Sequence, residues 1–150
     1  MFGKKFSEYV RFERWILILI AVVFVIRLAM SLHGTDFPTA SRASINIALL
    51  FGLIYCSIGV HLSGFGSYSQ LFGLLLIQNA FAHILIGFGI ALAIVTGTPN
   101  IYTAPEVFGG NDGANWFHAA LHVIVGPVLS VFSWLIGSVI LFVTKKLKPA

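Results

Sequence analysis

Two histidine–glycine pairs, one on each of the last two apolar stretches, are the residues best placed to do chemistry. His83 is followed by Gly87, and His122 by Gly126, each four residues later. On an α-helix, residues four apart lie on one face. A glycine one turn from an imidazole leaves a gap that a flat macrocycle such as haem can fill, and bundle cofactor sites are built between facing helices. The spacing therefore predicts His83 and His122 as ligands, with both glycines beside the cofactor.

The same helical faces carry two more polar side chains. Asn79 lies four residues before His83, and His118 lies four residues before His122. Buried polar groups in membrane helices tend to mark sites, so we expect haem b or another macrocycle here, with His118 as an alternative ligand. A quinone is the alternative cofactor. A buried histidine can also be a neutral structural residue, so a protein without any cofactor is the competing interpretation.

His118 and His122 also suggest a metal site. Two histidines four residues apart on a helix can both reach one metal ion, as in many zinc sites, and two histidines with a carboxylate also suit iron or copper. Glu106 is the predicted third ligand, with Asp112 and His33 as other candidates. This pattern predicts a transition-metal centre, and a metal-dependent membrane enzyme is one hypothesis for function.

Arg27 is a cation inside an apolar stretch. It lies twelve residues after Trp15, which is about 18 Å along a helix. An arginine at that depth either extends its side chain outward or binds an anionic partner. The predicted partners are Asp36, Glu106, Asp112 or a ligand carboxylate such as a haem propionate, which Arg42 could also neutralise.

Four apolar stretches must position these residues, at about 15–32, 45–62, 71–95 and 116–144. Each is long enough to cross a hydrocarbon core, which takes roughly 20 helical residues. The composition agrees, with 58% hydrophobic and 9% charged residues. We therefore predict an all-α integral membrane protein. Its fold is an up-down-up-down bundle of four transmembrane helices, and residues 1–150 form a single membrane domain.

The basic residues predict the orientation. Lysines and arginines precede the first stretch and follow the last, and an even number of spans places both termini on one side. The positive-inside rule makes that side cytoplasmic, so we expect a multi-pass protein of a bacterial inner membrane. Arg27 argues against a cleaved signal peptide, which leaves the first stretch as an anchor. The longer connections, 33–44 and 97–115, then lie on the outer side.

Several function classes are excluded or disfavoured. Basic residues gather at the chain ends, so nucleic acid is not an expected partner, and Cys56 is the only cysteine, which excludes an internal disulfide. Our leading hypothesis is a small membrane redox protein, or an accessory subunit of a membrane redox complex. The alternative is a cofactor-free structural or binding subunit. Expected partners are the lipid bilayer and other membrane subunits or further copies of the chain.

Overall fold

A computed structural model describes residues 1–106 and 113–149 of the chain. Within these residues all regular secondary structure is helical, and four long helices pack as a bundle. This confirms the predicted fold class. The helices are α1 (Phe6–Leu32), α2 (Phe37–Ala40), α3 (Ile45–Leu62), α4 (Tyr68–Thr96) and α5 (Trp116–Leu147).

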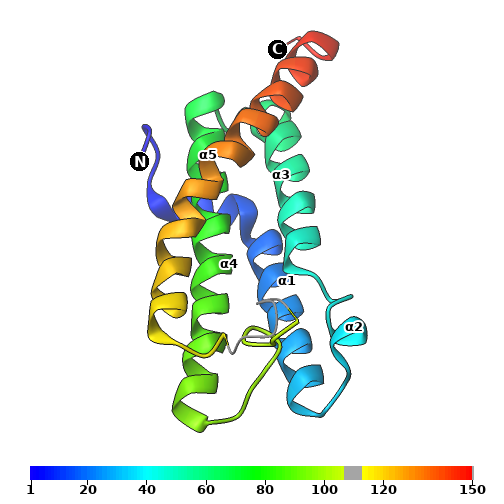
Figure 1. The fold of residues 1–150 in the computed structure, drawn as a ribbon. Coiled ribbons are helices and arrows are strands. Elements are labelled where there is room, and N and C mark those ends of the chain that lie inside the picture. Colours follow the sequence, from blue (N-terminus) through cyan, green and yellow to red (C-terminus); the bar gives the residue numbers. More distant parts are fainter. Residues whose placement is uncertain (107–112, 150) are drawn as a thin grey trace.

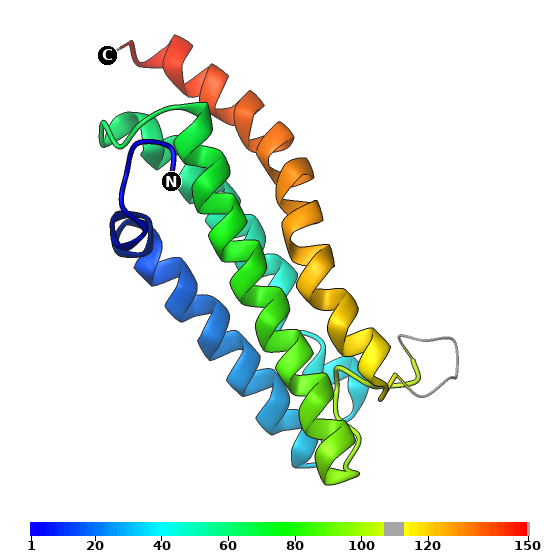
Figure 2. The same ribbon diagram turned by 90° about the vertical axis from the view of Figure 1, so that its left-hand side faces the viewer.

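The four long helices alternate in direction (Figures 1 and 2). Both chain termini and the short connection between α3 and α4 lie at one end of the bundle, which we call the terminus end. The connection carrying α2 and residues 97–106, which follow α4, lie at the opposite end, which we call the loop end. Residues far apart in the sequence therefore share a level along the bundle axis, and this decides which polar groups can meet.

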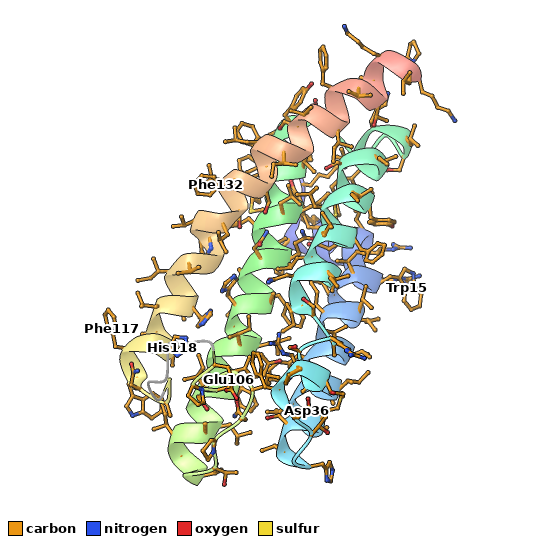
Figure 3. The ribbon with its side chains drawn as sticks, turned by 45° about the vertical axis from the view of Figure 1, so that its right-hand side comes forward. Trp15, Asp36, Glu106, Phe117, His118 and Phe132 are labelled. Carbon is orange, nitrogen blue, oxygen red and sulfur yellow. The ribbon has the colours of Figure 1, made fainter. Side chains whose placement is uncertain are left out.

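All four long helices are apolar and long enough to cross a membrane. Large hydrophobic side chains such as Trp15, Phe117 and Phe132 are exposed and point away from the bundle, as Figure 3 shows. Such side chains suit contact with lipid tails. The protein is thus a small multi-pass membrane protein, as its composition predicts.

Four helix boundaries differ from prediction. The expected first span began at residue 15, whereas α1 begins at Phe6, and α5 continues past residue 144 to Leu147. Helix α4 runs from Tyr68 to Thr96, slightly beyond the expected 71–95 at both ends. Hydropathy detects only the apolar part of a helix, so a polar first turn with charged side chains goes unrecognised. The difference matters because it places Glu13 well inside α1.

Helix α5 is continuous through a proline. It runs for 32 residues and contains Pro127. Proline has no N–H, so the Val123 carbonyl lacks its usual intrahelical donor. The helix starts against α4 at the loop end and leans toward α3 at the terminus end (Figure 1).

Glycines allow α5 to approach its neighbours at two levels. A Cβ on Gly126 would lie 3.0 Å from the His83 Cβ and 3.1 Å from the Asn79 carbonyl oxygen. A Cβ on Gly137 would lie 2.7 Å from the Ser57 hydroxyl of α3. Small residues at such crossings let membrane helices pack closely. The first crossing brings the two predicted histidine faces together.

Candidate functional site

Three histidines form a hydrogen-bonded chain between α4 and α5. His83 Nδ1 lies 2.8 Å from His122 Nδ1, and His122 Nε2 lies 3.2 Å from His118 Nε2. The chain ends at the loop end, where His118 Nδ1 lies 2.8 Å from the Gly113 carbonyl oxygen. The rings of His83 and His122 are stacked, with centroids 5.1 Å apart. The structure thus joins all three predicted histidines in one network.

The direction of each hydrogen bond follows from the terminal bond, between His118 and the Gly113 carbonyl. A carbonyl oxygen only accepts, so His118 donates from Nδ1, and in a neutral ring its Nε2 must then accept. His122 therefore donates from Nε2 and accepts at Nδ1, and His83 donates from Nδ1. With all three rings neutral, the lone pair on His83 Nε2 remains at the inner end of the chain. The network is therefore polarised, with every donor pointing toward the loop end.

The loop end holds His118 in place through backbone and side-chain contacts. Asn115 is the N-cap of α5, and its side-chain oxygen accepts from the His118 backbone N–H at 2.8 Å. Gly113 is buried, and its N–H donates to the Thr103 carbonyl. Asn100 then ties this loop to α4 by donating to the Gly89 carbonyl at 2.7 Å. The end of the histidine chain at His118 is therefore attached to a loop that is itself attached to α4.

The gaps predicted beside the two glycines are occupied by the facing helix. A Cβ on Gly87 would lie 3.2 Å from the Ala119 carbonyl oxygen, and the space at Gly126 is taken by α4. With the Nδ1 atoms of His83 and His122 2.8 Å apart, an iron between them would require α4 and α5 to separate. The haem site stays a prediction, and the arrangement shown here is a direct imidazole–imidazole contact.

Asn79 lies one turn below His83 and faces a groove. Its amide donates to the Leu75 carbonyl at 2.8 Å and approaches the Ser133 hydroxyl at 3.5 Å. It also lines a groove of about 260 Å³ between α3 and α5, together with Asn46, Ser133 and apolar side chains. A mainly apolar groove with a few convergent polar groups is the usual form of a small-molecule site.

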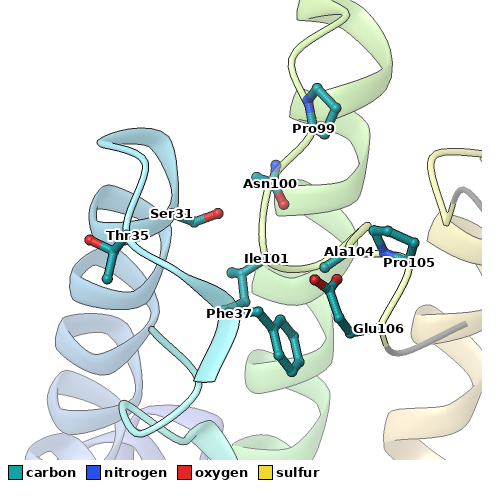
Figure 4. A pocket seen from close by; sticks show the side chains of 9 residues that line it. All are labelled: Ser31, Thr35, Phe37, Pro99, Asn100, Ile101, Ala104, Pro105 and Glu106. Carbon is teal, nitrogen blue, oxygen red and sulfur yellow. The ribbon is translucent and has the colours of Figure 1, made fainter. Parts of the chain in front are cut away.

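Glu106 lies in a different place from the histidine chain. It lines a hollow of about 180 Å³ at the loop end with Ser31, Thr35 and Asn100, shown in Figure 4. Over residues 1–106 and 113–149, no three His, Cys, Asp or Glu side chains are grouped to hold a metal ion. Asp112 lies outside the described residues. The metal site with His118, His122 and Glu106 stays a prediction.

Arg27 meets an aromatic ring at the loop end. Its guanidinium lies 5.4 Å from the centroid of the Tyr102 ring, and burial raises the pKa of Tyr102, which Arg27 partly opposes. Of its predicted partners, Asp36 instead caps α2: hydrogen bonds from the Thr39 side chain and backbone N–H lower the pKa of Asp36. Glu106 is exposed, and no ion pair with Arg27 occurs among the described residues.

Sequence reasoning missed Glu13. It is fully buried in α1, and neither carboxylate oxygen has a hydrogen-bond partner in the described part of the chain. On α4, the buried Gln78 also has an unpaired side-chain oxygen among the described residues. The signal was present, because Tyr9, Glu13, Ile16, Ile20 and Phe24 follow helical spacing and form the buried face of α1.

Comparison with known proteins provides no relative from which a role could be carried over. No protein-family model, no curated protein and no solved structure matches this chain. Function is therefore inferred from the histidine chain, the groove and the buried polar groups.

Proposed function

We propose that this protein is a small membrane redox protein, or an accessory subunit of a membrane redox complex, that binds a quinone in the groove between α3 and α5. The observation that carries the proposal is the polarised histidine chain, which begins one turn from the groove residue Asn79 and ends at the loop end. Quinone chemistry needs both a lipid-accessible site and a route for protons, and these two features lie side by side.

The groove suits a quinone head group. Its lining is mostly leucine, isoleucine and phenylalanine, which match the ring and the isoprenoid tail. Asn46, Asn79 and Ser133 supply hydrogen-bonding groups within that lining, and a quinone has two carbonyl oxygens to accept from them. Because the groove lies on the lipid-facing side of the bundle, a quinone can reach it from the bilayer.

The histidine chain suits the protons of the quinol form. Oxidation of a quinol to a quinone releases two electrons and two protons, and the electrons require an acceptor such as a partner redox subunit. With all three rings neutral, the His83 Nε2 lone pair is the acceptor position left at the end of the histidine chain that lies one turn from Asn79. Under the predicted orientation the loop end is the outer side, so protons taken up at His83 leave toward that side.

A photoreactive azido-quinone tests the proposal. The protein is placed in lipid nanodiscs, labelled in the light, digested and mapped by mass spectrometry. We expect adducts within residues 46–53 and 129–136, which line the groove, and we expect Asn79→Leu to reduce them. The matched control is the wholly apolar groove between α1 and α4, whose α1 side includes Phe6 and Leu17.

Two results would count against quinone binding. Equal labelling of both grooves would indicate simple partition into apolar surfaces, and labelling unchanged by Asn79→Leu would remove the proposed polar contact. The visible spectrum of the same purified protein distinguishes haem binding from quinone binding. A Soret band that sharpens on reduction would establish a haem in place of the quinone.

A further inference from the structure

Glu13 is the most unusual polar group in the bundle core. Its side chain has no exposed surface, and both oxygens lack hydrogen-bond partners among the described residues. An isolated charge in an apolar interior is far too costly to persist, so the carboxyl group there is neutral and carries a proton. Glu13 lies seven residues from the start of α1, about 10 Å along the helix from the terminus end.

Glu13 belongs to a polar layer formed by three helices. On α3, Cys56 lies within electrostatic reach of Glu13, and Gly52 lies one turn further toward the loop end. A Cβ on Gly52 would clash with both the Gln78 side-chain oxygen and Ile16, so Gln78 reaches from α4 toward α1 one turn beyond Glu13. The titratable group beside Glu13 is the Cys56 thiol of α3. Tyr9, one turn before Glu13 on the buried face of α1, instead donates from its hydroxyl to the Met1 carbonyl.

Helix α4 connects this layer to the histidine chain. Gln78 faces α1 and α3, and the next residue, Asn79, faces α5, where it approaches Ser133. His83 follows one turn later and begins the histidine chain. Polar groups therefore occur at successive levels from Glu13, near the terminus end, to Gly113 at the loop end.

We infer that Glu13, Gln78, Asn79 and the three histidines form a proton pathway across the membrane. Glu13 is the proton-binding group of the terminus half, and the histidine chain is that of the loop half. The unpaired oxygens of Glu13 and Gln78 can each accept a hydrogen bond from a water molecule. The pathway shares the histidine chain with the proposed quinone function but does not require a quinone.

The proton balance in the histidine chain is fixed by the tautomers. A proton from the Glu13 carboxyl passes through water to His83 Nε2, and a proton from water at the terminus end replaces it on Glu13. His83 then releases its Nδ1 proton to His122 Nδ1. His122 then releases its Nε2 proton to His118 Nε2, and His118 releases its Nδ1 proton to water beside Gly113. One proton enters and one leaves, and each ring ends as the other neutral tautomer. The rings must rotate before a second proton can follow in the same direction.

Proton flux into liposomes tests this inference. Purified protein is reconstituted into vesicles containing a pH-sensitive dye, and a potassium gradient with valinomycin drives protons inward. We expect flux well above that of protein-free vesicles. Glu13→Gln should reduce it about tenfold, because an amide of the same shape cannot carry a proton at this depth. The matched control is Glu8→Gln, an exposed acid on the same helix, which should leave the flux unchanged.

A labelling experiment needs no variant that could misfold. Dicyclohexylcarbodiimide reacts with protonated carboxyl groups in apolar surroundings, so we expect it to modify Glu13 in wild-type protein, spare Glu8 and stop the flux. Flux equal to that of protein-free vesicles, or flux that Glu13→Gln does not change, would overturn the inference. Because the vesicles contain no quinone, these outcomes are independent of the quinone-labelling result.

Discussion

The bundle buries polar side chains in two regions that treat them in opposite ways. Between α4 and α5, His83, His122 and His118 bind one another and end on a backbone carbonyl. Between α1, α3 and α4, Glu13 and Gln78 leave three side-chain oxygens without partners in the described part of the chain. A satisfied network stabilises the fold, whereas buried unpaired groups lower its stability.

The two regions differ in whether a contribution to fold stability can explain their buried polar groups. The histidine chain is explicable by packing alone, since five of its six ring nitrogens are paired with one another or with the Gly113 carbonyl. The Glu13 layer cannot be explained in that way, because an apolar side chain would fill the same space at lower cost. The same substitution to leucine should therefore change stability in opposite directions in the two regions. Cys56 provides the assay, because it is the only cysteine, is fully buried and becomes reactive to a thiol dye on unfolding.

The largest effect is expected in the middle of the histidine chain. His122→Leu removes a ring of similar volume and leaves His83 Nδ1 and His118 Nε2 without their present partner. We expect the free energy of unfolding to fall by about 2–3 kcal/mol, since each polar group left unpaired costs about 1 kcal/mol or more. The measurement is the temperature at which Cys56 reacts in mild detergent. A midpoint temperature equal to that of the wild type would show that the histidine chain contributes nothing to stability.

The second effect has the opposite sign. Glu13→Leu replaces an unpaired carboxyl group with an apolar side chain, so we expect the free energy of unfolding to rise by about 1–2 kcal/mol. The same thiol assay should show a higher midpoint. Loss of stability instead would mean that the Glu13 carboxyl makes a favourable contact, and the contrast between the two regions would disappear.

The smallest effect concerns the outer end of the histidine chain. Asn115→Ala removes the side-chain oxygen that caps α5 and holds the His118 backbone N–H. Loss of such a cap costs about 1 kcal/mol, so the thiol-reaction midpoint should fall less than for His122→Leu. Asn115→Asp keeps an accepting oxygen and serves as the control. If Asp and Ala behave alike, the cap does not support the chain.

Much of the fold could be predicted from the sequence, because lipid imposes simple requirements. Apolar length gave the bounds of α3 almost without error, and spacing of four residues placed His83 and His122 on facing sides of α4 and α5. The hypothesis failed to anticipate Glu13, since flanking Arg11 and Arg14 made that region resemble a solvated chain end. Helix α2 was also missed, because one turn is too short for a periodic signal.

The contents of the site were harder to predict than its residues. A glycine beside an imidazole allows close approach of any flat or slender group, and the sequence does not distinguish a macrocycle from a neighbouring helix. At Gly126 the group that approaches is α4 itself. Asn79 illustrates the same limit, because its place in a groove depends on how far α3 and α5 diverge, which no local pattern encodes.

Pro127 gives α5 a mechanical property that the other long helices lack. The Val123 carbonyl directly after His122 has no intrahelical donor, so bending there breaks no backbone hydrogen bond. The position at which α5 bends most easily thus lies at the level where His122 contacts α4. A small swing of the loop-end half of α5 would lengthen the His83–His122 contact while the rest of the bundle stays packed. In the proposed proton pathway, the angle of this one helix would then switch conduction through the three histidines.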